Sequence, residues 1–247
     1  MRREPRVAIA VTALFVLLTG CSAGTPTGPT PARGAPRPTY RISVRRILAF
    51  GDSLTAGTTS PLVNRGMSAG LPQSYPARLQ RLLTRWYPDQ AITVENGGNP
   101  GEHASVAVRR LAAMLPVVNP DVVILLHGAN DIAGGGGVGG GLLALAALQT
   151  MVYDANLSGA RVILCTLLPQ RPGTPRTANP VVVAGFNERI RDVARIEDIA
   201  LADLAQELDV SLIGVDGLHP TEEGYVRMAD AIFAVFRELF ERPPLLH

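Results

Sequence analysis

The sequence contains no lysine, because all 23 of its basic residues are arginine. Schiff-base chemistry, attachment of pyridoxal phosphate and a P-loop lysine are therefore excluded. Cysteine and histidine are scarce as well, with two Cys and four His in 247 residues. None of them stands at the close spacings that zinc or iron–sulfur sites require. The sequence thus predicts no metal site.

Charge is distributed unevenly along the chain. Residues 1–45 hold seven Arg and one Glu, whereas residues 46–247 hold 16 Arg and 20 acidic residues. The sequence pI of 8.8 therefore reflects the N-terminal segment, and the remainder is mildly acidic. Without a basic footprint in the remainder, nucleic acid is not an expected partner. The length of 247 residues is enough for one α/β domain with a sizeable core.

The first 20 residues have the features of an export signal. Three arginines precede the apolar run Val7–Leu18, which is too short to span a bilayer comfortably. The following Leu18-Thr19-Gly20-Cys21 resembles the lipobox of bacterial lipoproteins, in which the cysteine becomes the acylated first residue. The resemblance implies an exported protein anchored to a membrane through Cys21, on the periplasmic side or at the cell surface. The alternative is an ordinary signal peptide in which Cys21 is a bystander.

Composition divides the rest of the chain into a tether and a domain. Residues 21–42 are rich in Pro, Gly, Ser and Thr and predict an extended tether, and residues 43–247 predict a folded domain. From Arg46 onward, apolar runs alternate with segments of helical periodicity. Strands are expected at Ile47–Phe50, Ala91–Val94, Val122–Leu126, Arg161–Leu167 and Ile199–Ala202, and helices near Ser74–Trp86, Glu102–Leu115, Leu142–Leu157, Val181–Ile196 and Glu222–Phe240.

These expected strands show no polar alternation, which is typical of a parallel sheet covered by helices on both faces. In such sheets, binding sites form at the carboxyl ends of the strands. The motifs that carry chemistry should therefore follow strands directly.

A serine and a histidine stand at opposite ends of the domain. The strand Ile47–Phe50 runs straight into Gly51-Asp52-Ser53-Leu54, which predicts an exposed Ser53 hydroxyl near a helix N-terminus. Asp216 stands three residues before His219, close enough to orient the imidazole through Nδ1 and leave Nε2 free to take the serine proton. In the alternative interpretation, Ser53 caps a helix, His219 is a core residue and Asp216 only holds a turn.

Two clusters of glycine and amide residues lie between these ends, at Asn96–Gly101 and His127–Asp131. Acyl transfer develops an oxyanion, and the backbone N–H groups of Ser53 and Gly98 with the side-chain amide of Asn130 are suited to bind it. Alternatively, Asn130 holds a turn by bonding its own backbone.

Together these motifs resemble the four blocks of the GDSL/SGNH hydrolase family, in that family's order. The resemblance covers roughly residues 46–240. It implies a flavodoxin-like α/β fold, a three-layer α/β/α sandwich with a five-stranded parallel sheet, and serine hydrolysis of esters without metal or cofactor. The residues that carry it, and the roles it implies, are Ser53, Asp216 and His219 as a catalytic triad, and Ser53, Gly98 and Asn130 as the oxyanion hole.

The second block departs from the family pattern, because Glu102 and His103 follow Gly101 where small and hydroxyl residues are more usual. Two other motif matches are set aside. Gly66-Met67-Ser68-Ala69-Gly70 fits a nucleophile elbow, but loop residues surround it instead of a strand and a helix. The glycine-rich Gly134–Gly141 matches a dinucleotide-binding pattern trivially, and we interpret it as a flexible loop bordering the cleft.

The expected reaction is hydrolysis of small-molecule, carbohydrate or lipid esters through an acyl-enzyme on Ser53. Short acyl groups are favoured, because Thr58–Gln73 and Gly134–Gly141 are rich in Gly, Ser and Pro and suit an open cleft. The alternatives are a thioesterase or lysophospholipase acting on longer chains with the same residues, an acyltransferase, and a non-catalytic surface-binding lipoprotein.

Overall fold

A computed structural model describes residues 40–59, 72–133 and 135–243 of the chain. The described residues belong to one compact unit, which comprises residues 38–247 of the chain. The export signal and Cys21 lie outside the described residues, as does Ser68 with most of the loop Thr58–Gln73.

Five strands form one parallel sheet, as the sequence predicts. They are paired in the order β3-β2-β4-β5-β6, and every pair is parallel. Burial on both faces explains the continuous apolar character of the central strand β4, each residue of which is buried. The strands are β2 (Arg46–Gly51), β3 (Thr93–Gly98), β4 (Val122–Leu126), β5 (Arg161–Cys165) and β6 (Ala200–Ala202).

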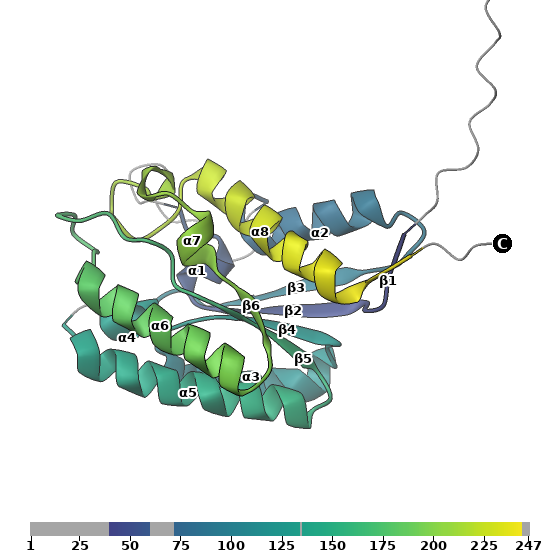
Figure 1. The fold of residues 1–247 in the computed structure, drawn as a ribbon, viewed down its shortest axis with the longest axis horizontal. Coiled ribbons are helices and arrows are strands. Elements are labelled where there is room, and N and C mark those ends of the chain that lie inside the picture. Colours follow the sequence, from purple (N-terminus) through teal and green to yellow (C-terminus); the bar gives the residue numbers. More distant parts are fainter. Residues whose placement is uncertain (1–39, 60–71, 134, 244–247) are drawn as a thin grey trace, which may run out of the picture. The chain divides into compact units, whose positions relative to one another are not determined.

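Helices cover both faces of this sheet (Figure 1). The first face packs against α2 (Tyr75–Trp86) and α8 (Glu222–Phe240), and the opposite face against α3 (Ala104–Val118), α5 (Gly137–Leu157) and α6 (Pro180–Ile196). The core is continuous through the three layers. The predicted α/β/α sandwich is confirmed.

Several short elements complete the unit. Short helices follow strands β2, β4 and β6 directly, namely α1 (Ser53–Ala56), α4 (Ala129–Ile132) and α7 (Leu204–Glu207), and a 3₁₀ helix, η1 (Val210–Leu212), comes next in the chain. A two-residue strand β1 (Arg41–Ile42) pairs antiparallel with β7 (Glu241–Arg242). Residues 41 and 42, which composition assigned to the tether, therefore belong to the folded unit.

The strand order creates a topological switch point at the carboxyl ends of β2 and β4. Strand β3 lies on one side of β2 and β4 lies on the other, so the connections that leave β2 and β4 diverge. A crevice at such a switch point is the usual binding site of a doubly wound sheet. Ser53 follows β2 and Asn130 follows β4, so both residues lie at this switch point.

The glycine-rich segment differs from the expected loop, because α5 begins at Gly137 instead of Leu142. Gly140 N–H donates to Gly136 O at 2.8 Å. A Cβ at either glycine would collide with the carbonyl oxygen of Asp131. These glycines therefore allow the start of α5 to pack against the end of α4, a close approach that only glycine permits.

Strand β3 also differs from expectation, since Thr93–Gly98 replaces the expected Ala91–Val94. Its parallel pairing with β2 continues to Gly51 opposite Gly98, so main-chain hydrogen bonds override the low strand propensity of glycine. The other elements agree with expectation within a few residues, and α3 extends past its Pro116 to Val118.

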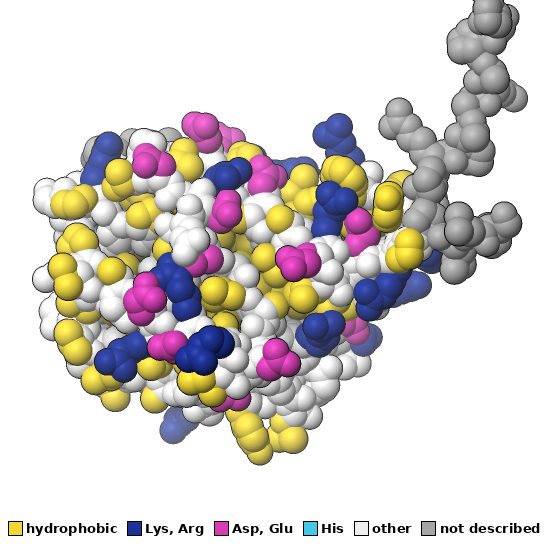
Figure 2. Space-filling view, in the orientation of Figure 1, with side chains coloured by type: hydrophobic (Ala, Val, Ile, Leu, Met, Phe, Trp, Pro, Cys, Tyr) yellow, Lys and Arg dark blue, Asp and Glu magenta, His cyan; other side chains and the backbone are white. Residues whose placement is uncertain are grey.

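Surface charges are interspersed by sign on the face shown in Figure 2. On α6, Arg191 contacts Asp203 at 2.8 Å and Arg195 contacts Asp192 at 3.0 Å. Within the described residues, α5 is the one helix long and apolar enough to cross a membrane by length and composition. Its side chains Leu148 and Met151 are buried in the domain core.

The glycines of α5 give a matched pair of substitutions. A Cβ at Gly139 meets nothing within 4 Å, whereas one at Gly140 meets the Asp131 carbonyl. Gly139→Ala should raise the free energy of unfolding by about 0.5–1 kcal/mol, because alanine loses less backbone entropy in a helix. Gly140→Ala should lower it. Urea denaturation measures both, and equal effects would contradict the packing role of Gly140.

Candidate active site

A chain of two hydrogen bonds joins Ser53, His219 and Asp216. His219 Nε2 lies 2.8 Å from Ser53 Oγ, across 166 positions of sequence. His219 Nδ1 lies 2.6 Å from Asp216 Oδ2. The sequence led us to expect an exposed serine, but Ser53 is only 4% exposed. The packing of α1 against the end of β3 accounts for this burial, because Gly98 lies directly against the Ala56 backbone.

Asp216 is held on both sides of its carboxylate. Oδ2 faces the imidazole, while Oδ1 accepts hydrogen bonds from the backbone N–H groups of Leu218 and His219 at 3.2 and 3.1 Å. Burial acts to raise the pKa of Asp216, but the His219 ring and these backbone donors outweigh burial and lower it. The ionised Asp216 then accepts from Nδ1–H, which leaves Nε2 as an acceptor for the Ser53 hydroxyl.

Asp52 fixes the turn that presents Ser53. Its side chain is fully buried, and Oδ1 caps α1 by accepting the Leu54 N–H at 2.9 Å. Burial raises the pKa of Asp52. These contacts make Asp52 a residue that holds the turn and joins the surrounding hydrogen-bond network. Because Ser53 is the first residue of α1, its own N–H has no partner within the helix.

Gly98 is the last residue of β3, where a side chain has no room. An added Cβ would collide with the backbone of Ala56 in α1. In this structure the Gly98 N–H donates to Asn96 Oδ1 at 3.0 Å. An oxyanion that binds the Gly98 N–H would have to share it with Asn96 Oδ1 or displace that oxygen. The Asn96 Nδ2 atom is buried without a hydrogen-bond partner among the described residues.

Asn130 lies in α4 and bonds to two other segments. Its Nδ2 donates to the main-chain carbonyl of Glu102 at 3.0 Å, and it lies 3.4 Å from Asp52 Oδ2. The amide is thus oriented by the segment that follows β3 and by the turn that follows β2. These bonds do not resemble the local turn that the alternative interpretation expects.

A buried ionic cluster lies behind these donors, and the sequence analysis did not identify it. The Glu102 carboxylate receives Arg110 Nη2 at 2.6 Å and Asn99 Nδ2 at 3.1 Å, and His127 Nε2 lies 3.4 Å away. The Arg110 guanidinium also lies 4.0 Å above the Phe50 ring. One signal of this cluster was present in the sequence: Glu102 stands in the second block where the family usually has a small or hydroxyl residue.

Hydrogen bonding sets the charge of Glu102. Burial acts to raise its pKa, but hydrogen bonds from His127, Arg110 and Asn99 outweigh burial and lower the pKa to about 2. His127 Nδ1 accepts the Gly128 N–H at 3.1 Å, so Nε2 is the atom that carries the proton toward Glu102. This histidine is a buried network residue.

Asp131 and His103 stand beside the cluster. The Asp131 carboxylate accepts the Ala104 N–H at 3.0 Å and so caps α3, whose positive end favours a negative charge. His103 is largely exposed, 3.6 Å from Asp131. Within residues 40–59, 72–133 and 135–243, no group of three His, Cys, Asp or Glu side chains could hold a metal ion.

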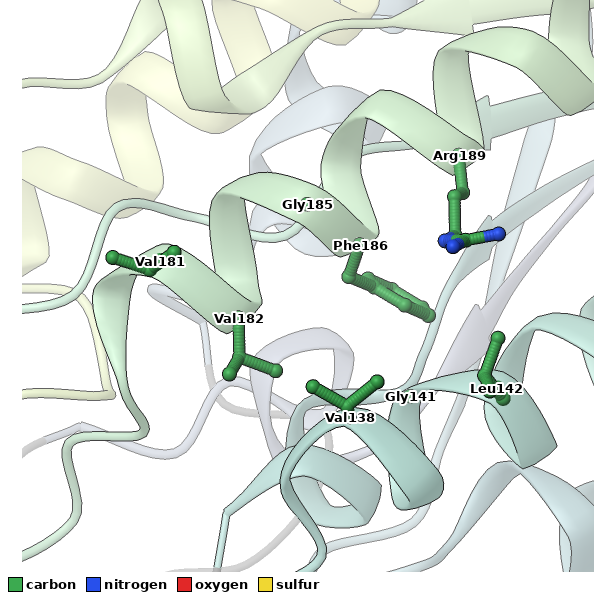
Figure 3. A pocket seen from close by; sticks show the side chains of 8 residues that line it. All are labelled: Val138, Gly141, Leu142, Val181, Val182, Gly185, Phe186 and Arg189. Atoms are coloured by element: carbon green, nitrogen blue, oxygen red, sulfur yellow. The ribbon is translucent and has the colours of Figure 1, made fainter.

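An apolar pocket of about 230 Å³ lies between α5 and α6, away from the Ser53–His219 pair. Phe186 and Arg189 point from α6 toward Leu142 of α5 (Figure 3). The Phe186 ring also lies next to Gly128, where an added Cβ would collide with it, two residues before Asn130. The pocket thus borders the scaffold of the site, and no residue of the hydrogen-bonded chain lines it.

The fold and this geometry define an α/β/α sandwich with a buried serine–histidine–aspartate chain at its switch point. A family model for the GDSL-like lipase/acylhydrolase family matches residues 49–227. The chain therefore belongs to the GDSL-like lipase/acylhydrolase family, a family of hydrolases.

Solved structures share the fold at low sequence identity. A lipase/acylhydrolase from Enterococcus faecalis aligns with a TM-score of 0.63 and 22% identity, over 82% of this chain and 100% of the other. A carbohydrate acetylesterase family member from Sinorhizobium meliloti aligns with a TM-score of 0.65 and 20% identity, over 78% and 98%. No curated protein matches the chain.

Glu102 should make stability depend on pH. Its pKa is about 2 in the fold against an ordinary 4.5, so ionised Glu102 stabilises the fold above pH 4.5. This contribution, on the order of 3 kcal/mol, is lost as pH falls toward the folded pKa. Wild type should therefore have a higher free energy of unfolding than Glu102→Gln at pH 4.5, and this difference should decrease as pH falls to 2. Urea denaturation at several pH values checks this, and a constant difference would contradict it.

Proposed function

We propose that this chain is a serine esterase that hydrolyses carboxylic esters through an acyl-enzyme on Ser53. The observation that carries the proposal is the hydrogen-bond chain from Asp216 through His219 to Ser53, with distances of 2.6 and 2.8 Å. A nucleophile, a base and a group that orients the base are the parts that acyl transfer requires.

In the proposed reaction, Ser53 Oγ attacks the ester carbonyl carbon while His219 Nε2 takes the hydroxyl proton. Asp216 stabilises the imidazolium that forms. The tetrahedral intermediate collapses, the C–O bond to the alcohol breaks, and His219 protonates the departing alcohol. A water molecule then attacks the acyl-enzyme with His219 as base, and the carboxylic acid leaves with Ser53 restored.

The oxyanion of each tetrahedral intermediate is assigned to three donors: the N–H groups of Ser53 and Gly98 and the amide of Asn130. Support comes from their positions at the ends of β2, β3 and β4. Removing one such donor typically lowers kcat by about 10²–10³-fold.

For the substrate we propose esters with short acyl groups. Outside the strands and helices, the described sequence offers no long apolar segment to form a lid over a fatty chain. The neighbour named as a carbohydrate acetylesterase family member supports acetyl-sized groups. The apolar pocket between α5 and α6 is lined by other residues than the proposed triad, and no acyl chain is assigned to it.

Ser53→Ala should lower kcat on an activated aryl ester by about 10³-fold or more, because it removes the hydroxyl that His219 activates. The melting temperature should stay near that of wild type. Ser68→Ala is the matched control, because Ser68 belongs to the second serine motif of the sequence. Loss of activity in Ser68→Ala with retention in Ser53→Ala would overturn the assignment.

Acetyl and butyryl esters should be hydrolysed with higher kcat/KM than octanoyl or palmitoyl esters of the same alcohol. The proposal assumes an open acyl site, which adds little binding per methylene, and ordering a long chain has an entropic cost. Steady-state kinetics on this series measures the trend. A rise toward octanoyl or palmitoyl would instead favour a thioesterase or lysophospholipase.

We further propose that Cys21 carries a lipid anchor and that the mature protein is exported to the membrane surface. The ground is the lipobox-like sequence before Cys21. Each buried CH₂ contributes about 0.8 kcal/mol, so several acyl chains hold the protein where one does not. Wild type should partition to membranes, and Cys21→Ser should be soluble or poorly exported. An unmodified N-terminus at another residue would remove the anchor.

A further inference from the structure

We propose that Arg110, held in place by Glu102, is a positioning residue that aims the oxyanion-binding groups of the site. This inference rests on the proposed esterase function and deepens it. Arg110 lies in α3, outside the motifs of the sequence analysis, and touches no reacting atom. Its contacts nevertheless reach the ends of both β2 and β3.

The first contact fixes the peptide group that contains the Gly98 N–H. Arg110 Nη1 donates to the carbonyl of Gly97 at 2.7 Å. That carbonyl and the Gly98 N–H belong to one planar peptide unit, in which the two groups point in opposite directions. A bond that holds the carbonyl therefore sets the direction of the N–H, which is the donor assigned to the oxyanion.

The second contact acts on the strand that carries the nucleophile. Arg110 Nη2 donates to the carbonyl of Gly51 at 3.0 Å, two residues before Ser53. Gly51 lies opposite Gly98 in the parallel pairing of β2 with β3. One guanidinium thus ties together the strand ends that supply two of the three proposed oxyanion donors.

Glu102 links this guanidinium to the third donor. Its carboxylate receives Arg110 Nε at 2.9 Å and Nη2 at 2.6 Å, and its main-chain carbonyl accepts the Asn130 amide at 3.0 Å. By fixing the Glu102 side chain, Arg110 therefore also fixes the Glu102 main-chain carbonyl, which orients the Asn130 amide. Such a support is needed, because a misplacement of about 1 Å in an active site can lower the rate by about 10²-fold.

A second arginine of similar burial serves as a control. The Arg191 side chain is 24% exposed and pairs with Asp203, while that of Arg110 is 25% exposed and pairs with Glu102. The guanidinium of Arg191 bonds carboxylates, those of Asp203 and Glu188. It makes no bond to the ends of β2, β3 or β4, so loss of this pair should affect stability alone.

The test compares kcat and KM of Arg110→Met, Arg110→Lys and Arg191→Met on a short-chain aryl ester. Titration of the active sites gives the concentration of folded enzyme, and kcat is calculated from that concentration. Arg110→Met should lower kcat by about 10–100-fold with little change in KM, because the affected groups bind mainly the transition state. Arg110→Lys should recover part of the loss, since one ammonium reaches fewer acceptors. Arg191→Met should keep the wild-type kcat.

The outcomes separate the two proposals. An Arg110→Met protein with wild-type kcat, or one that changes KM alone, overturns the positioning role and leaves the esterase function intact. A wild-type protein that hydrolyses neither the short-chain aryl ester nor any ester from acetyl to palmitoyl overturns both the positioning role and the esterase function. If Arg110→Met does not fold, the double variant Glu102→Gln/Arg110→Met, which leaves no carboxylate unpaired, replaces it in the same comparison with the same expected loss of kcat.

Discussion

The close parallel pairing of β2 with both β3 and β4 is the constraint on which the site depends. Gly51 lies opposite Gly98 on one side and Leu126 on the other, so the ends of the three strands are level. Ser53 and Asn130 follow two of these ends within a few residues. Glycine is required at Gly51 and Gly98, because a Cβ at either would collide with neighbouring backbone. Backbone packing thus places Ser53, Gly98 and Asn130 at one level of the sheet edge.

The same edge concentrates buried charge, and its hydrogen bonds decide which charges persist. At Asp52, burial outweighs the nearby histidines and the Leu54 N–H and raises the pKa. At Asp216 and Glu102, hydrogen-bond donors outweigh burial and lower the pKa. Both carboxylates are consequently ionised near neutral pH, one beside His219 and one beside Arg110. Replacing a buried ion pair by well-packed apolar residues often leaves stability unchanged, so such a pair fits a role in orienting groups. The stabilisation by ionised Glu102 is relative to its protonated form, with Arg110 still in place.

Much of the fold was predictable, because strong apolar periodicity survives in the chain. Strand β4 (Val122–Leu126) and helix α8 (Glu222–Phe240) have the expected bounds. The start of α5 was predicted wrongly, because its glycines were interpreted as a loop. The helix begins there because these glycines pack against Asp131, a tertiary contact that composition does not encode. In the site, local motifs identified Ser53 and His219. The Glu102–Arg110 cluster was missed because Arg110 reaches a carbonyl 59 residues away in sequence.

The central claim is that Ser53 is the nucleophile, activated by His219. Its most direct test is labelling with a fluorophosphonate, which traps an activated serine, followed by peptide mass spectrometry. The account predicts a single phosphonyl group on Ser53, attached far more slowly in His219→Ala, because Nε2 accepts the hydroxyl proton. A phosphonyl group on Ser68, or an active esterase that gains no label at Ser53, would contradict it.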